Sequence, residues 1–210
     1  MKSYNVICRR ATEKDDIAAI ARYIYLTDPY IYPTICNSPD DESWINMISC
    51  CYFSNNNIFS MENFFVAELD NKIVGILCIV PCGQHKRFAE DVSINISLNP
   101  GLTKANIGYF CPLIEEILAF DGFNITNLCI DETCQGSGIG TKLLEFCLKY
   151  YGSSKIHLDV IAHNRSAIAL YQKMGFKISA EYNGFSGNEQ PLLCYHMERI
   201  PCINVNSESY

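Results

Sequence analysis

The stretch Gln135-Gly136-Ser137-Gly138-Ile139-Gly140 lies between a β-rich run over 124–131 and a helical pattern over 138–151. Its three glycines allow the backbone to come close to a ligand. The helix that follows directs free N–H groups and the positive end of its dipole at this loop, and such a helix start is a ready site for an anion. The stretch therefore predicts either a site for a phosphate-bearing cofactor or a glycine-rich turn that only starts the helix.

The spacing of these glycines excludes two common nucleotide-binding loops. A Walker A loop requires Gly-Lys-Ser/Thr, whereas this chain reads Gly-Thr-Lys over 140–142. A dinucleotide fingerprint that starts at Gly136 requires a glycine at 141, and one that starts at Gly138 requires a glycine at 143; the chain has Thr and Leu there. A nucleotide-binding protein of either kind is therefore disfavoured.

A second segment follows a strand expected at 156–161 and reads Asn164-Arg165-Ser166-Ala167-Ile168-Ala169-Leu170-Tyr171-Gln172-Lys173-Met174-Gly175-Phe176. Together, the two segments resemble the GNAT superfamily of acyl-CoA N-acyltransferases. Its members carry a Gln/Arg-x-x-Gly-x-Gly/Ala loop after the fourth strand and, about 25 residues later, an Asn-x-x-Ala-x-x-Leu-Tyr-x-Lys-x-Gly-Phe segment. The resemblance covers residues 124–180, and the pair of motifs is more specific than either alone.

The resemblance implies an α/β protein with the GNAT fold: a central mixed, mostly antiparallel sheet of about seven strands, flanked by helices and splayed between strands 4 and 5. It also implies an N-acetyltransferase that moves an acetyl group from acetyl-CoA to a primary amine. Direct attack is expected, because no His-paired nucleophile pattern surrounds Cys129 or Cys134. The alternative is a non-catalytic module of the same fold that binds an acyl-CoA. Acetyl-CoA is the expected co-substrate, and no metal is expected.

The resemblance further assigns roles to single residues. The pyrophosphate is expected on the N–H groups of 135–140, and the pantetheine arm between the fourth and fifth strands. The Ile130 N–H is expected to polarise the thioester carbonyl. Tyr171 is expected to be the general acid that protonates the CoA thiolate, or else a buried tyrosine that packs the helix. The expected cofactor-binding residues are Leu128, Cys129, Ile130, Gln135, Gly136, Ser137, Gly138, Ile139, Gly140, Thr141 and Asn164.

The acceptor amine must lose a proton before it attacks, and the sequence leaves the base open among Asp131, Glu68 and water. His157 and His163 flank the fifth strand and are interpreted as structural. In this superfamily the first two helices, their loop and the loop between the last strands recognise the acceptor. Carboxylates and aromatic rings in these segments suit an ammonium group, or they form a solvated acidic surface. The side chains concerned are Asp28, Tyr30, Tyr32, Asp40, Asp41, Glu42 and those of 182–189.

The remaining elements follow from periodicity and turn signals. Thr12 is expected to cap a first helix that ends at Asp28. Asp70-Asn71-Lys72 predicts a tight hairpin. The chain is expected to form one domain over 1–200 with a C-terminal tail at 201–210. The other expected elements are strands at 4–10, 64–69, 73–80, 92–98, 177–182 and 192–199, helices at 41–52, 103–120 and 166–174, a loop at 30–39, and an unusually long connection over 81–122.

The chain has 210 residues with 16 Lys and Arg against 23 Asp and Glu, a net charge of −7, and 49% hydrophobic residues. These values exclude a disordered chain and argue against non-specific nucleic-acid binding. No run reaches the roughly 18 apolar residues of a membrane helix, and the N-terminus shows no signal peptide. A cytoplasmic protein without membrane partners is therefore expected, and both a monomer and a homodimer are compatible with the sequence.

Twelve cysteines are scattered along the chain. Without a secretion signal, they are expected to be reduced thiols that pack as small hydrophobic side chains. Cys78, Cys82 and His85 come nearest to a metal cluster. A second pair of ligands does not accompany them, so no metal site is expected.

Overall fold

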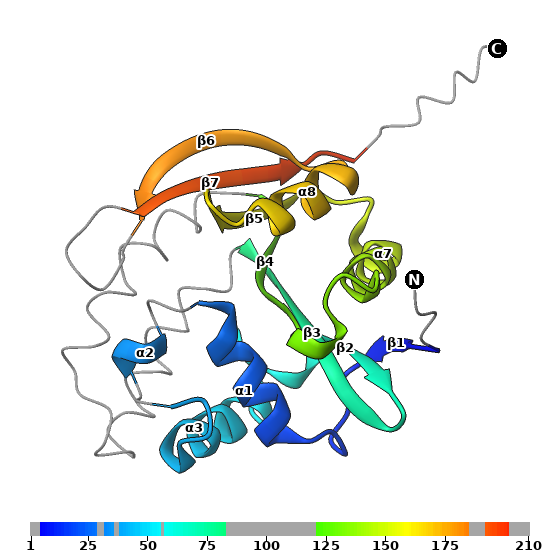
Figure 1. The fold of residues 1–210 in the computed structure, drawn as a ribbon, viewed down its shortest axis with the longest axis vertical. Coiled ribbons are helices and arrows are strands. Elements are labelled where there is room, and N and C mark those ends of the chain that lie inside the picture. The colour runs from blue at the N-terminus through cyan, green and yellow to red at the C-terminus, as the bar shows by residue number, and fades with distance from the viewer. Residues whose placement is uncertain are drawn as a thin grey trace.

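Seven strands form one sheet in the computed structural model, which describes residues 5–28, 32–35, 38–55, 57–82, 121–184 and 192–201. The strand order is β1-β2-β3-β4-β5-β7-β6, and the β4–β5 pair is parallel while the other pairs are antiparallel (Figure 1). The elements are β1 (Ile7–Arg10), α1 (Ile17–Thr27), α2 (Tyr32–Ile35), α3 (Glu42–Tyr52), η1 (Met61–Asn63), β2 (Phe64–Leu69), β3 (Lys72–Pro81), β4 (Phe123–Ile130), η3 (Glu132–Cys134), α7 (Ile139–Tyr151), β5 (Ile156–Ile161), α8 (Arg165–Lys173), β6 (Lys177–Gly184) and β7 (Leu192–Arg199).

The predicted fold class is confirmed: the sheet is mixed, mostly antiparallel and flanked by helices on both faces. The helix expected at 103–120 and the strand expected at 92–98 lie outside the described residues, as does nearly all of the tail at 201–210. Within the part of the chain that the structure describes, no helix is long and apolar enough to cross a membrane.

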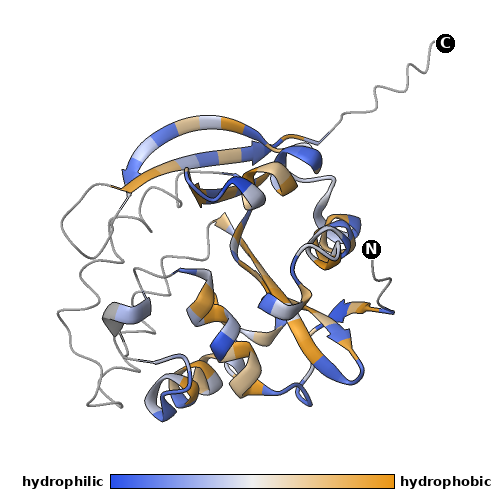
Figure 2. Ribbon diagram, viewed as in Figure 1, coloured by the Kyte–Doolittle hydropathy of each residue, from blue (hydrophilic) through white to orange (hydrophobic). Residues whose placement is uncertain are grey.

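Two apolar clusters hold the helices against the sheet. Helices α1 and α3 cover one face through a cluster that includes Ile24 and Trp44, and α7 and α8 cover the other through Leu143 and Ile168. The middle strands are buried on both faces, so they are hydrophobic along most of their length rather than alternating (Figure 2). Packing on both faces holds the middle strands in place between the two pairs of helices.

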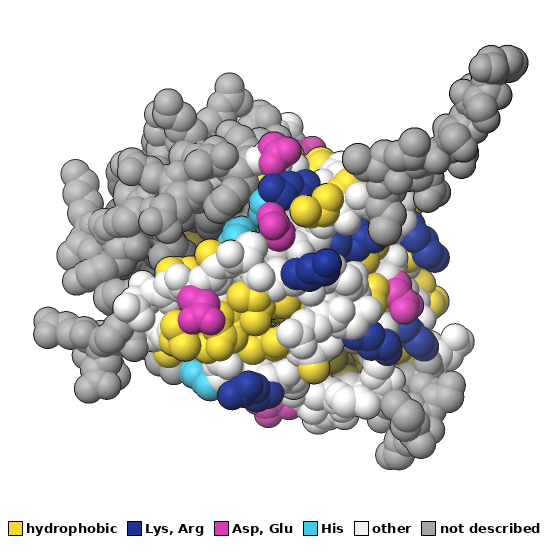
Figure 3. Space-filling view, turned by 90° about the horizontal axis from the view of Figure 1, so that it is seen from above, with side chains coloured by type: hydrophobic (Ala, Val, Ile, Leu, Met, Phe, Trp, Pro, Cys, Tyr) yellow, Lys and Arg dark blue, Asp and Glu magenta, His cyan; other side chains and the backbone are white. Residues whose placement is uncertain are grey.

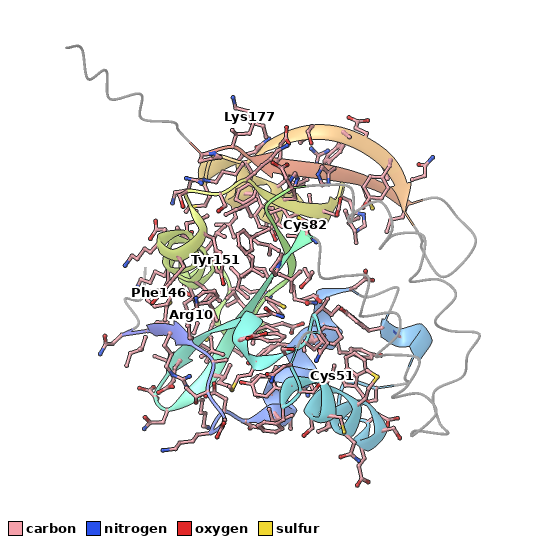
Figure 4. The ribbon with its side chains drawn as sticks, turned by 180° about the vertical axis from the view of Figure 1, so that it is seen from behind. Arg10, Cys51, Cys82, Phe146, Tyr151 and Lys177 are labelled. Atoms are coloured by element: carbon pink, nitrogen blue, oxygen red, sulfur yellow. The ribbon has the colours of Figure 1, made fainter. Side chains whose placement is uncertain are left out.

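Aromatic side chains fasten α7 to the sheet near its C-terminal end. The ring of Phe65 on β2 lies 5.9 Å from the ring of Phe146 and 6.1 Å from that of Tyr151, both on α7. The guanidinium of Arg10 lies over the Phe65 ring at 5.1 Å and over the Tyr150 ring at 4.7 Å. Figure 4 shows Phe146, Tyr151 and Arg10 gathered between α7 and the sheet. These contacts hold α7 firmly, so its first turn is presented in a fixed place.

The β2–β3 hairpin confirms the predicted turn. Asp70 and Asn71 both adopt positive φ angles, 51° and 61°, between the paired residues Leu69 and Lys72. This two-residue geometry matches the right-handed twist of the strands.

At the other edge of the sheet, β6 and β7 lie at the top of the molecule, where hydrophobic side chains lie among scattered charges (Figure 3).

The start of α1 differs from the prediction. Asp16, and not Thr12, caps the helix: its carboxylate accepts hydrogen bonds from the N–H groups of Ala18 and Ala19 at 3.0 and 3.2 Å. The N–H of Thr12 instead donates to the carboxylate of Asp15, which also accepts a hydrogen bond from the guanidinium of Arg9. Asp15 is therefore committed to a turn before the helix, and the next residue takes the cap. A second difference is α2, a short helix inside the loop expected at 30–39.

Candidate functional site

The sheet opens between β4 and β5. The two strands pair only at Phe123–Ile156, Asn124–His157 and Ile125–Leu158, while β4 stays paired with β3 as far as Ile130 (Figure 1). Thr126 is an extra residue on β4, because the β3–β4 register shifts between Cys78 and Ile79. A bulge of this kind bends its strand. The predicted splay between the fourth and fifth strands is therefore confirmed, and it begins at the bulge.

The register decides which backbone groups face this opening. The N–H of Asp131 donates to the carbonyl of Val74 at 2.9 Å, so the pair Gly75–Ile130 is a non-hydrogen-bonded pair of the ladder. The N–H and C=O of Ile130 therefore point away from β3 and toward the opening. Leu128, two residues earlier, points the same way. Cys129 turns its N–H and C=O toward β3, so within 128–130 only Leu128 and Ile130 direct main-chain groups at the opening.

The loop over 135–140 has the open geometry that its glycines require. Gly136 and Gly138 have φ angles of 70° and 86°, which L side chains rarely adopt. A Cβ placed at either glycine meets no described atom within 4 Å, so the loop presents a bare backbone on this side. The side chain of Gln135 folds back and donates to the carbonyl of Ile130 at 3.0 Å, which ties the loop to the end of β4.

Helix α7 starts directly behind the loop. Gly138 is its N-cap, no side chain caps it, and the first helical bond runs from the N–H of Lys142 to the carbonyl of Gly138 at 3.1 Å. The N–H groups of 139–141 consequently have no acceptor within the helix. A Cβ on Gly140 would lie 3.4 Å from Leu170 and 3.6 Å from Ile130, which are ordinary contact distances, so α7 starts close to α8 and β4. The free N–H groups at the start of α7 therefore lie beside the opening, in an arrangement that can bind an anion.

Helix α8 carries the two other predicted residues. Asn164 is its N-cap and accepts hydrogen bonds from the N–H of Ala167 at 3.1 Å and from the Ser166 hydroxyl at 3.0 Å. Its amide nitrogen takes no part in these bonds. Tyr171 is 8% exposed and shares the apolar cluster of Leu128. Burial raises the pKa of Tyr171, and its hydroxyl has no hydrogen-bond partner among the described residues.

The two carboxylates predicted as candidate bases are engaged elsewhere. Asp131 accepts hydrogen bonds from the N–H and hydroxyl of Thr133, and these bonds lower the pKa of Asp131; the Tyr23 hydroxyl also donates to it at 3.0 Å. Glu68 lies on β2, two strands away from the opening, and forms an ion pair with Arg9 at 2.6 Å. Asp131 is therefore a weakened base, and Glu68 is a structural carboxylate.

Two of the acidic side chains predicted to face the acceptor have structural roles instead. Asp40 forms an exposed ion pair with Arg22 at 2.9 Å, and Asp41 caps α3. Tyr32 stays close to the opening: Asn127 of β4 donates to its hydroxyl at 3.1 Å and to the Thr27 hydroxyl at 2.7 Å. These bonds hold the end of α1 and the start of α2 against β4. Tyr30 lies outside the described residues.

Sequence reasoning missed Asp159. It is the first residue of β5 beyond the last pair with β4, so it stands at the base of the opening. A carboxylate oxygen of Asp159 lies within hydrogen-bond distance, 2.9 Å, of Nδ1 of His196. The side chain of Tyr182 also forms a hydrogen bond with this carboxylate. Burial raises the pKa of Cys194, and the carboxylates of Asp159 and Asp28 raise it further, so both carboxylates lie near that thiol. The alternation His157-x-Asp159 was the available signal, because it places both side chains on one face of the strand.

The described cysteines are free thiols; most of them are buried, whereas Cys50 is exposed. Burial raises the pKa of Cys78 and of Cys129 to about 12, so both remain protonated at neutral pH. Among the residues that the structure describes, no three His, Cys, Asp or Glu side chains come together as metal ligands. His85, one member of the candidate metal cluster, lies outside those residues.

The comparison with known proteins agrees with this geometry. The family described as "Acetyltransferase (GNAT) domain" matches residues 60–178, which is more than half of the chain. The protein therefore belongs to the GNAT acetyltransferase family.

Single relatives match shorter stretches. An N-alpha-acetyltransferase of Sulfurisphaera tokodaii is 30% identical over 118 residues, which is 54% of this chain and 56% of that protein. A spermine/spermidine N(1)-acetyltransferase of Bacillus subtilis is 38% identical over 61 residues, which is 26% of this chain and 40% of that protein. The chain thus spans about half or less of these relatives. An N-acetyltransferase structure from Staphylococcus aureus shares the fold with a TM-score of 0.67 at 17% identity, covering 91% of this chain and 99% of that one.

Proposed function

We propose that the protein is an N-acetyltransferase that transfers the acetyl group of acetyl-CoA to a primary amine by direct attack. One observation carries the proposal: the backbone of Leu128 and Ile130 faces the β4–β5 opening, directly beside the open backbone of the 135–140 loop. An extended pantetheine arm could complete the missing strand pairing, while the pyrophosphate meets the start of α7. The whole chain is proposed to act as one domain over 1–200.

The cofactor-binding role falls to backbone groups. The free N–H groups of 139–141 and the left-handed glycines would receive the pyrophosphate, and the Ile130 N–H would donate to the thioester carbonyl. Acetyl-CoA supplies an activated acetyl group on a thiol that leaves readily. Asn164 holds the start of α8 in place and retains an amide N–H₂ for the cofactor. These assignments retain the residues predicted from the sequence, apart from the main chain of Cys129.

Tyr171 is proposed as the general acid that donates a proton to the departing CoA thiolate. Burial raises the pKa of Tyr171, so the hydroxyl keeps its proton throughout the neutral range. The hydroxyl also has no acceptor among the described residues, so its proton is available to a ligand. A thiolate formed within hydrogen-bond reach would be such an acceptor.

The acceptor is proposed to be a primary amine that arrives as an ammonium ion. The net charge of −7 and the two carboxylates near Cys194, Asp28 and Asp159, favour a cation on this side of the sheet. The two relatives named above act, by their names, on a polyamine and on an α-amino group. Since Asp131 and Glu68 are engaged, the nitrogen is proposed to lose its proton to water, the third of the predicted routes.

The test is a thiol-release assay over a panel of primary amines with wild-type protein and Tyr171→Phe. We expect a fall in kcat of about 100-fold or more with little change in the KM for acetyl-CoA, because only the proton donor is lost. Tyr151→Phe is the matched control, since this partly buried ring packs on Phe123 at 4.5 Å, on α7 and away from α8. Tight CoA binding by the wild type without release on any amine would instead support the non-catalytic module.

A further inference from the structure

A chain of hydrogen bonds joins two histidines on neighbouring strands, outside the residues assigned to acetyl-CoA. Nε2 of His157 lies 3.0 Å from the carbonyl oxygen of Asp121, and Nδ1 of the same ring lies 3.1 Å from Nε2 of His196. Nδ1 of His196 lies 2.9 Å from a carboxylate oxygen of Asp159. The two rings are stacked, with centroids 5.3 Å apart. His157 is fully buried and His196 is 8% exposed, so bulk water competes little for these bonds.

The groups at the two ends of this row of hydrogen bonds, the Asp121 carbonyl and the Asp159 carboxylate, determine how many protons the two rings carry. A carbonyl oxygen and an ionised carboxylate only accept hydrogen bonds, so three contacts require three protons on the four ring nitrogens. Two neutral imidazoles carry only two N–H protons between them. With Asp159 ionised, one of the two rings is therefore a doubly protonated imidazolium.

The surroundings place the positive charge on His196. Burial lowers the pKa of His157, and the charges of His196 and Lys155 lower it further, against the opposing effects of Glu198 and the Asp121 carbonyl. His196 instead lies directly against the carboxylate of Asp159. A cation beside an anion is favoured, whereas a cation in the fully buried position is not. His157 is then neutral, with its proton on Nε2.

The other ionisable groups near the pair agree with this assignment. Burial raises the pKa of Tyr182 on β6 and of Cys194 on β7, so both are neutral at pH 7. Asp28 at the end of α1 adds a second negative charge close to Cys194. Lys155 is engaged by Glu198 at 3.3 Å and by Asp121 at 3.7 Å.

Asp159 stands where an acceptor amine would approach. It follows Leu158, the last residue of β5 that pairs with β4, and its side chain is 23% exposed. Leu158 and Val160 on either side of it pack into the cluster under α7 and α8, so Asp159 lies on the opposite face, where α1 covers the neighbouring strands. The carboxylate is therefore at the opening, on the face away from the two helices that would hold acetyl-CoA.

We infer that His196 is an imidazolium that orients Asp159 as an ionised carboxylate, and that this carboxylate accepts a hydrogen bond from the acceptor ammonium. His157 is the neutral anchor: its Nε2–H donates to the Asp121 carbonyl, and its Nδ1 accepts a hydrogen bond from Nε2 of His196. The inference rests on the proposed acetyltransferase function for the identity of the ligand, but not for the protonation of the two rings. His196 and His157 are positioning residues, because they act through Asp159.

The protonation is tested on the wild-type protein by ¹⁵N NMR of its labelled histidines at pH 7. His157→Gln and His196→Gln assign the signals, and His163 provides an internal reference. We expect His157 to show the neutral pattern with the proton on Nε2, and His196 to show the pattern of a ring protonated on both nitrogens. A neutral His196, or a charged His157, would overturn the inference. Neither result depends on turnover.

The positioning role is tested by the amine KM of two variants. The amide of His196→Asn can still donate to Asp159 from the place of Nδ1, whereas that of His196→Gln reaches the place of Nε2 and contacts His157 instead. We expect His196→Gln to raise the KM for the amine about ten- to a hundredfold, with the KM for acetyl-CoA unchanged. His196→Asn should recover most of the loss, and His163→Gln should match the wild type. Equal amine KM values for all four proteins would contradict the role, and an inactive wild type would refute the acetyltransferase proposal while the NMR result stands.

Discussion

Gly138→Trp separates the cofactor role of the 135–140 loop from its role in the fold. Gly138 has a φ of 86°, and a Cβ there meets no described atom within 4 Å. The substitution therefore costs backbone strain but causes no clash within the described protein. A left-handed conformation costs an L residue about 1–2 kcal/mol. For a protein of this size, about 2–4 °C of Tm per kcal/mol gives a fall of about 2–8 °C.

The indole has a separate effect on CoA. It would occupy the space in front of the free N–H groups of α7, where the pyrophosphate is proposed to bind. At a CoA concentration of about 100 times Kd, binding stabilises the wild type by about 2.7 kcal/mol, which is a rise in Tm of about 5–11 °C. In Gly138→Trp we expect this rise to vanish. Thermal unfolding followed with and without CoA, supported by titration calorimetry, measures both effects.

Gly175→Ala is the matched control. Gly175 also has a positive φ, 88°, and the nearest atom to a Cβ there is an Arg199 side-chain nitrogen at 3.8 Å. It lies at the opposite end of α8 from Asn164. We therefore expect a similar fall in Tm with the full response to CoA. If Gly138→Trp kept the full response, the assignment of the loop as the pyrophosphate site would be wrong.

Three further substitutions test the surrounding structure. Trp44→Phe removes the buried hydrogen bond from the indole to the carbonyl of Ala21 at 2.8 Å; we expect a loss of about 1–3 kcal/mol in urea unfolding, and no measurable loss would contradict the packing of α3 on α1. Glu68→Gln removes the charge that pairs with Arg9, whose Nε and Nη2 both donate to Glu68 and whose side chain is 30% exposed. It should cost at most about 1 kcal/mol and leave kcat unchanged, whereas a large fall in kcat would restore Glu68 as a base. Hydrogen bonds from Thr133 lower the pKa of Asp131 in the fold, so its contribution to stability is present above the unfolded pKa of about 3.9 and is lost as the pH falls below it. In Asp131→Asn, the free energy of unfolding should therefore decline less between pH 5 and pH 3 than in the wild type. An unchanged decline would contradict the hydrogen bonds from Thr133 to Asp131 as the cause of the lowered pKa.

The features that were predictable from the sequence are those set by local patterns. The glycines of the 135–140 loop, the hairpin at Asp70-Asn71 and the helical motif ending in Gly175-Phe176 each fix a backbone conformation within a few residues. The splay between β4 and β5 followed from the resemblance that these motifs carry. The N-cap of α1, which is Asp16 and not Thr12, could not be predicted from the sequence. It depends on the ion pair between Arg9 and the carboxylate of Asp15.

The rest depends on strand register, which a single sequence does not contain. From the sequence, Cys129 had the same expected main-chain role as Leu128 and Ile130. Its pairing with Ile76 directs its N–H and C=O toward β3. The partnership of Asp159 with His196 likewise arises because the two residues face each other across β5 and β7. Contacts between residues so far apart in the chain follow from topology and not from spacing.

A crystal structure of the protein with CoA tests the central claim most directly. We predict the pyrophosphate on the N–H groups of Gly136, Gly138 and 139–141, the pantetheine arm against the backbone of Leu128 and Ile130, and the sulfur within hydrogen-bond reach of the Tyr171 hydroxyl. CoA bound away from the opening between β4 and β5, or bound there with its sulfur out of reach of Tyr171, would contradict the account.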